Sequence, residues 1–126
     1  MPSARPKTAV ATAEPAPKEG GSCAGTQCCP QLHEAVELVG KRWSGAILSV
    51  LMAGGPMRFS EIAQAVPQLS DRLLSERVKE LEARGLVERT AYPESPVRVE
   101  YALTQMGREL EPALAELQSW ARRWLD

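Results

Sequence analysis

The sequence contains no long apolar run, and this absence excludes several classes of protein. Its 126 residues hold no stretch near the roughly 20 apolar residues that cross a bilayer. No secretory signal is expected either, because Lys7, Glu14 and several prolines interrupt each apolar segment near the N-terminus. We therefore expect a cytoplasmic protein without membrane contact, in which Cys23, Cys28 and Cys29 are free thiols at rest.

The residues that most enzymes need for catalysis are also scarce. There is one histidine, no glycine-rich phosphate loop and no Ser-His-Asp set. We expect no enzyme, no catalytic residue and no cofactor. Fifteen Lys and Arg face sixteen Asp and Glu, so the net charge of −1 gives no support for nucleic-acid binding. Any DNA-binding surface must come from the local placement of charges.

What is present fits one small folded domain preceded by an arm. Hydrophobic residues make up 44% and charged residues 25%, which is ordinary for a globular domain. Residues 1–28 are rich in Ala, Pro, Thr, Gly and Ser, which predicts a disordered N-terminal arm. Pro30 suits the first position of a helix with Cys29 as its N-cap, so the folded domain is expected over 29–126.

Apolar residues at helical spacing predict four helices in the first part of this domain. Gly40 is expected to end the first, Ser44 to cap the second, Ser60 to cap the third, and Ser70 to cap the fourth before Gly85. The segments are 30–40, 45–53, 58–66 and 71–84. The short turn between the third and fourth segments predicts a helix-turn-helix.

The remainder reads as a hairpin followed by a helix. Residues 86–92 and 97–103 have period-two character and are separated by the sequence PESP. From Thr104, a predicted cap, an apolar stripe continues to the end of the chain. The fold class expected is mainly α (α+β), a winged helix-turn-helix with a two-stranded wing and flanking dimerisation helices.

The fourth helix has one apolar and one polar face. Successive residues 100° apart place Leu74, Val78 and Leu81 together, and the charged residues opposite them. We expect this polar face to read base edges in the major groove, where Arg pairs with guanine and Glu accepts from cytosine. The predicted contacts are Ser70, Arg72, Ser75, Glu76 and Lys79. The alternative is a solvated face held by ion pairs such as Glu76 with Lys79.

Two arginines outside this helix are further candidate DNA contacts. Arg98 lies in the wing, where a side chain near the hairpin tip can reach a groove, and Arg58 precedes the third helix. The alternative for Arg98 is a cross-strand pair with Glu88 or Glu100.

The last helix carries more apolar surface than so small a domain needs to cover. Its stripe runs from Met106 to Trp124, with Trp120 beside it. This predicts a homodimer built on the first and last helices, which would bind a pseudo-palindromic operator in double-stranded DNA.

The sequence resembles a known family at several points. These are Cys29-Pro30, Gly40 to Trp43, Arg58-Phe59-Ser60, Leu81 to Arg89 and the segment PESPVRVEYALT. Their order and spacing over 29–126 are similar to the HxlR-type (MarR-like) winged helix-turn-helix transcription regulators. The resemblance implies a homodimeric regulator, which we expect to act as a repressor. Whether it also responds to a small-molecule effector is left open by the sequence.

Cys29 is the candidate redox-sensing residue. A helix N-terminus lowers the pKa of a thiol and favours the reactive thiolate. The resemblance implies that some relatives sense oxidants or electrophiles at this position, whereas others act without it. Cys28 or Cys23 would be the resolving thiol, although the family often has a single cysteine here. The alternative is that Cys29 only caps the helix.

Two other interpretations remain open. Cys23, Cys28, Cys29 and His33 are ligands that zinc accepts, but their spacing lacks two separated pairs and argues against a metal site. The alternative function is an interaction module, a winged helix that dimerises or antagonises another regulator without binding DNA specifically.

Overall fold

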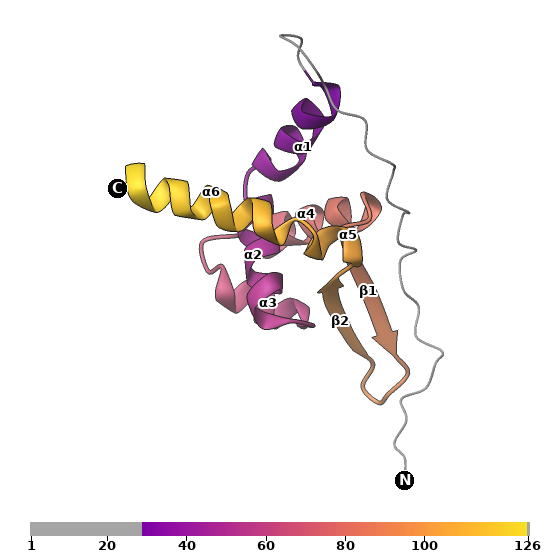
Figure 1. Ribbon diagram of the computed structural model, residues 1–126. Helices are drawn as coiled ribbons and strands as arrows, with labels where there is room; N and C mark the ends of the chain where they lie inside the picture. The colour runs from indigo at the N-terminus through magenta and orange to yellow at the C-terminus, as the bar shows by residue number, and fades with distance from the viewer. Residues whose placement is uncertain (1–28, 126) are drawn as a thin grey trace.

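The computed structural model describes residues 29–125, which form six helices and one hairpin. Figure 1 shows the hairpin and α1 projecting from a helical body. The elements are α1 (Pro30–Gly40), α2 (Ser44–Gly54), α3 (Phe59–Ala65), α4 (Asp71–Ala83), β1 (Val87–Tyr92), β2 (Arg98–Leu103), α5 (Gln105–Arg108) and α6 (Glu111–Trp124). The predicted arm over 1–28 lies outside the described residues.

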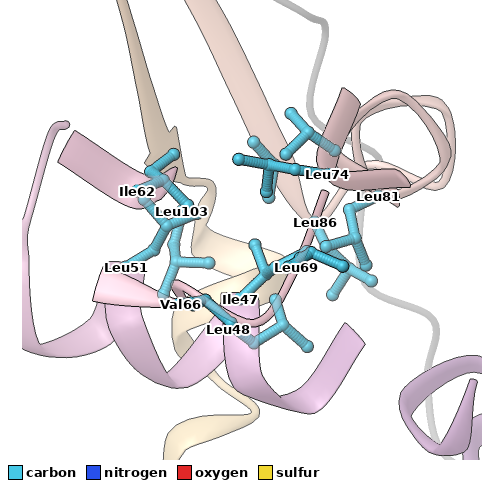
Figure 2. Packing of buried hydrophobic residues seen from close by; sticks show 12 residues of the cluster. Ile47, Leu48, Leu51, Ile62, Val66, Leu69, Leu74, Leu81, Leu86 and Leu103 are labelled. Carbon is cyan, nitrogen blue, oxygen red and sulfur yellow. The ribbon is translucent and has the colours of Figure 1, made fainter. Parts of the chain in front are cut away.

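The hydrophobic core lies between α2, α3, α4 and the base of the hairpin. Ile47 and Leu48 of α2 are completely buried, and Leu74 of α4 is buried with them (Figure 2). The core also contains Leu51, Ile62, Val66, Leu69, Val78, Leu81, Leu86, Val87 and Leu103. The apolar stripes predicted for these helices therefore pack against one another, as amphipathic helices do.

α3 and α4 form the predicted helix-turn-helix. The turn between them is fixed because Val66 and Leu69 are buried in the core. The Ser70 hydroxyl caps α4 by accepting a hydrogen bond from the Leu73 backbone N–H at 3.1 Å. Beyond α4, Gly85 has a φ of 87°, the left-handed conformation that often follows a helix.

The wing is a two-stranded antiparallel sheet in which Val87 pairs with Leu103 and Tyr92 pairs with Arg98. Met57 adds a bridge to its outer edge, since the backbones of Met57 and Tyr101 exchange two hydrogen bonds. This bridge fastens the wing to the segment before α3. The winged helix-turn-helix predicted from the sequence is confirmed.

Two helix starts differ from the prediction. α3 begins after Arg58 rather than Ser60, because the Glu61 carboxylate accepts the Arg58 backbone N–H at 2.8 Å and closes the first turn there. Ser44 is the first residue of α2 and not its cap. Its N–H donates to the Lys41 carbonyl in a tight turn, which leaves Trp43 with a φ of 74°.

The single helix predicted after Thr104 is two helices. Thr104 does cap the first of them, accepting from the Gly107 N–H at 3.1 Å, but α5 ends at Arg108. Pro112 explains the break, because a proline ring clashes with the carbonyl four residues earlier, here that of Arg108. The chain therefore bends before α6 begins at Glu111.

α1 and α6 contribute no fully buried residue. α1 rests on α2 through the half-buried Leu38 and Val39, and α6 rests on the core through Leu114. Figure 1 shows both helices extending from the body. Among residues 29–125, no helix has the length and apolar content needed to span a membrane.

Gly107→Ala should destabilise the protein, because the new Cβ would press on the Leu86 carbonyl oxygen and lie 3.1 Å from the Leu103 side chain. Overpacking of this kind costs about 1 to 3 kcal/mol, which urea denaturation at one fixed protein concentration would measure. Gly40→Ala is the matched control, since nothing lies within 4 Å of its Cβ and no loss is expected. Equal stability of the two variants would contradict the prediction.

Candidate nucleic-acid interface and thiol site

The outer face of α4 presents charged side chains to solvent. Arg72, Glu76 and Lys79 are exposed, whereas Leu74 and Val78 on the opposite face are buried. Because the buried face packs in the core, the charged face is directed to solvent. The structure brings these three predicted contact residues together on one surface.

The two serines of the predicted contact set lie at the edge of this face. The Ser70 hydroxyl is exposed but is engaged in capping α4. Ser75 is half-buried on the flank of the helix. Arg58 is exposed at the start of α3, and its backbone N–H is bound by Glu61.

Arg98 is held inside the wing. Only 16% of its side chain is exposed, and its guanidinium lies 3.2 Å from the Glu94 carboxylate and 3.5 Å from that of Glu100. It also stacks over the ring of Tyr92, its partner on the neighbouring strand, at 4.4 Å. In this arrangement the charge of Arg98 is neutralised within the wing.

Two arginines that the sequence analysis passed over have defined places. Arg89 is exposed on β1, although alternation puts it on the same side of the strand as the buried Val87. Arg77 pairs with Glu80 and Glu76, and its i,i+3 spacing to Glu80 was the available signal.

Cys29 is the N-cap of α1, as predicted. Its sulfur accepts a hydrogen bond from the Leu32 N–H at 3.4 Å, and Pro30 occupies the first turn. The expectation of free thiols is wrong for Cys29, which is disulfide-bonded. Disulfide formation depends on the redox surroundings, which a sequence does not specify. Cys29 is the only cysteine of the described residues; Cys23 and Cys28 lie outside them.

His33, which the sequence analysis considered as a zinc ligand together with the three cysteines, lies on α1. Its imidazole is 3.5 Å from the Glu37 carboxylate. Within the part of the chain that the structure describes, no three His, Cys, Asp or Glu side chains are grouped in a way that could hold a metal ion. Cys23 and Cys28 of that set are not described.

Exposed apolar side chains gather on α1 and α6. Leu32 and Val36 of α1 are exposed, as are Leu117, Trp120 and Trp124 of α6. An apolar hollow is lined by residues of α1 and of the segment around α5, and a groove lies between α2 and α6. The hollow is lined by Ala35, Leu38, Val39, Leu86, Met106, Glu109 and Leu110. These surfaces lie on the elements expected to form a dimer.

Known proteins are similar to this chain in sequence and in fold. The uncharacterized HTH-type transcriptional regulator YvaP of Bacillus subtilis is 48% identical over 101 residues, covering 80% of this chain and 93% of YvaP. The HTH-type transcriptional regulator YodB of Bacillus subtilis is 45% identical over 102 residues, covering 81% of this chain and 90% of YodB. The solved reduced form of YodB covers 79% of this chain and 97% of its own with a TM-score of 0.73.

The redox regulator HypR in its oxidized form is 34% identical with a TM-score of 0.71, covering 78% of this chain and 99% of HypR. The model of the family described as HxlR-like helix-turn-helix matches residues 38–126. Proteins of this kind are DNA-binding transcription regulators and not enzymes, so both the resemblance and the expectation of no enzyme are confirmed. The chain belongs to the HxlR-like helix-turn-helix family.

Proposed function

We propose that this regulator binds a pseudo-palindromic operator as a homodimeric repressor, and that disulfide chemistry at Cys29 changes its affinity for the operator. The observation that carries the proposal is the charged outer face of α4, which stays exposed while the opposite face anchors the helix in the core. A regulator of this kind acts where the chromosome is, which supports the expected cytoplasmic location.

We assign base reading to Arg72 and Glu76 and a phosphate contact to Lys79. The second helix of a helix-turn-helix enters the major groove with its N-terminal residues at base edges. Arg72 lies in the first turn of α4, and Lys79 follows two turns later on the same face. Ser70 and Ser75 lie at the edge of this surface, and Arg58 is exposed at the start of α3; all three are kept as candidate contacts to the DNA. Arg98 is kept as a wing contact only on the condition that DNA displaces Glu94 or Glu100.

Arg72→Ala should weaken binding to the operator by about 1 to 3 kcal/mol and relax the preference at one base pair, because a bidentate contact to guanine is lost. Arg122→Ala is the matched control, since it removes the same charge near the far end of α6. Gel-shift titrations against the promoter region of the protein's own gene measure both. Unchanged affinity in an Arg72→Ala, Lys79→Ala double variant would favour the alternative interaction module.

Homodimer formation is supported by the exposed apolar side chains of α1 and α6. Leu117 is 56% exposed and Trp124 is 69% exposed, although both are large apolar groups that favour burial. A two-fold pairing of these helices with their copies would remove this surface from water. It would also present two α4 helices to adjacent half-sites, which are about 34 to 36 Å apart.

Leu117→Glu should convert the dimer to a monomer at micromolar concentration, because a carboxylate would have to be buried without a partner. Sedimentation velocity measures the mass directly. Val97→Glu is the matched control, since Val97 is 64% exposed on the wing and its substitution should leave the dimer intact. A wild-type protein that sediments as a monomer would remove the dimer from the proposal.

Redox control is supported by the place of Cys29 and by the relatives. Cys29 begins α1, the helix whose apolar side chains are assigned to the dimer. YodB has been solved in reduced, diamide-treated and quinone-bound forms, and HypR in reduced and oxidized forms. Cys29 is disulfide-bonded in the structure, which therefore describes the oxidised state. Forming this disulfide from two thiols passes two electrons and two protons to the oxidant, and the change between the reduced and oxidised states would shift α1. Cys28, or else Cys23, is the proposed second thiol, within one chain or across the dimer.

Diamide should change the operator affinity of the reduced wild type by about 5- to 150-fold, the usual range for coupled sites. Cys29→Ser should abolish the change, and Cys28→Ser should reduce it if Cys28 is the resolving thiol. The measurement is an operator titration before and after diamide, with a non-reducing gel to detect links between chains. An equal response in wild type and Cys29→Ser would leave Cys29 as a helix cap.

A further inference from the structure

One flank of α4 carries charged side chains that turn away from its outer face. Arg77, Glu80 and Arg84 are three and four residues apart, so they lie along one side of the helix. With 3.6 residues per turn, this side is about a third of a turn from Arg72 and Lys79. This side faces α1 and the linker between α1 and α2, residues 41–43.

Arg77 joins α4 to the backbone of this linker. Its Nε–H donates to the Arg42 carbonyl oxygen at 2.9 Å, and its Nη1 donates to both carboxylate oxygens of Glu80 at 3.3 and 3.4 Å. Only 13% of the Arg77 side chain is exposed. A guanidinium with these partners and this burial is committed to the protein interior.

Glu80 extends the same contact to a second linker residue. Its Oε2 lies 3.0 Å from Nζ of Lys41, so the carboxylate bridges Lys41 and Arg77. We call Lys41, Arg42, Arg77 and Glu80 the linker clamp. One turn farther along the chain, at the C-cap of α4, Nη2 of Arg84 lies 2.6 Å from Oε2 of Glu34 in α1.

The linker is itself a fixed base for the clamp. The Ser44 N–H donates to the Lys41 carbonyl at 2.9 Å, which closes the turn between α1 and α2. Trp43 has a φ of 74° and is partly buried against the core. The Arg42 guanidinium also lies 5.6 Å from the centre of the Trp43 ring. The carbonyl that Arg77 binds therefore belongs to a chain segment held at several points.

The apolar face of α4 does not fix its position by itself. Burial of Leu74, Val78 and Leu81 is non-directional and tolerates small rotations and shifts along the axis. Hydrogen bonds have defined lengths and angles, and bidentate reading of a base requires such precision of its own. We propose that Arg77 is a positioning residue: with Glu80 and Lys41 it sets the rotation of α4, so that the linker determines operator affinity without touching DNA. This inference rests on the proposed function of α4 as the reading helix.

The experiment measures operator affinity of the full chain across a range of salt concentrations. The variants are Arg77→Gln, Glu80→Gln and Lys79→Gln. We expect Arg77→Gln and Glu80→Gln to weaken binding by about 5-fold or more, with the slope of log K against log salt unchanged. Lys79→Gln, the matched phosphate contact, should lower that slope by about 1.

Glu80→Gln separates positioning from simple electrostatics. It removes a negative charge from α4, so a general charge effect would strengthen DNA binding, whereas loss of the clamp weakens it. Arg77→Lys adds a second test, because it keeps the charge but loses the Nε–H that binds Arg42. Its affinity should stay below that of the wild type. Tighter or unchanged binding by Glu80→Gln, or a slope lowered by about 1 in Arg77→Gln, would overturn the proposal.

Amide hydrogen exchange keeps the clamp testable if α4 is not the reading helix. In that case the Lys79→Gln variant binds the operator as tightly as the wild type does. This result would contradict the proposed function of α4 without contradicting the linker clamp. The clamp still predicts faster exchange at the Ser44 amide and in the second half of α4 for Arg77→Gln, at a temperature where circular dichroism shows both variants folded. Equal exchange in Arg77→Gln and Lys79→Gln would overturn it.

Discussion

The burial of one face of α4 is the constraint on which the other features depend. Leu74, Val78 and Leu81 are removed from water almost completely, and each buried side chain of this type is worth about 1.5 to 3 kcal/mol. The face opposite these residues is left to solvent, so Arg72, Glu76 and Lys79 point outward. The chain leaving α4 passes through the buried Leu86 into β1, so the same packing also sets where the wing begins.

The sequence was sufficient to predict the elements whose signals are local. The stripes of α2 and α4, the caps Cys29, Ser70 and Thr104, and the two wing strands all follow from spacing or from one side chain beside its own backbone. The failures have different causes. The start of α3 depends on a carboxylate folding back, and the start of α2 depends on a left-handed Trp43. The break before α6 was available from Pro112, but the continuous apolar stripe outweighed it.

The candidate site was likewise predictable only where its signals are local. A helical projection was enough to place Arg72 and Lys79 on the outer face, because it needs only the period of the helix. For Arg98, the alternative of a pair with Glu100 is present in the structure, although Glu100 lies on the same strand, and the second partner, Glu94 of the hairpin loop, was not predicted. Arg77 was missed because its decisive partner is a backbone carbonyl 35 residues earlier. The bonding of Cys29 depends on redox conditions, which no pattern of residues encodes.

The break at Pro112 has a consequence for how such regulators diverge. α5 is tied to the base of the wing through Thr104 and Gly107, while α6 starts anew after the short joint at Glu109 and Leu110. In a dimer joined through α6, the angle at this joint determines how far apart two reading helices stand. Substitutions at the joint would alter that separation and leave every base-reading side chain in place. A lineage could thereby change the spacing of the half-sites that it recognises while keeping its preference for their sequence.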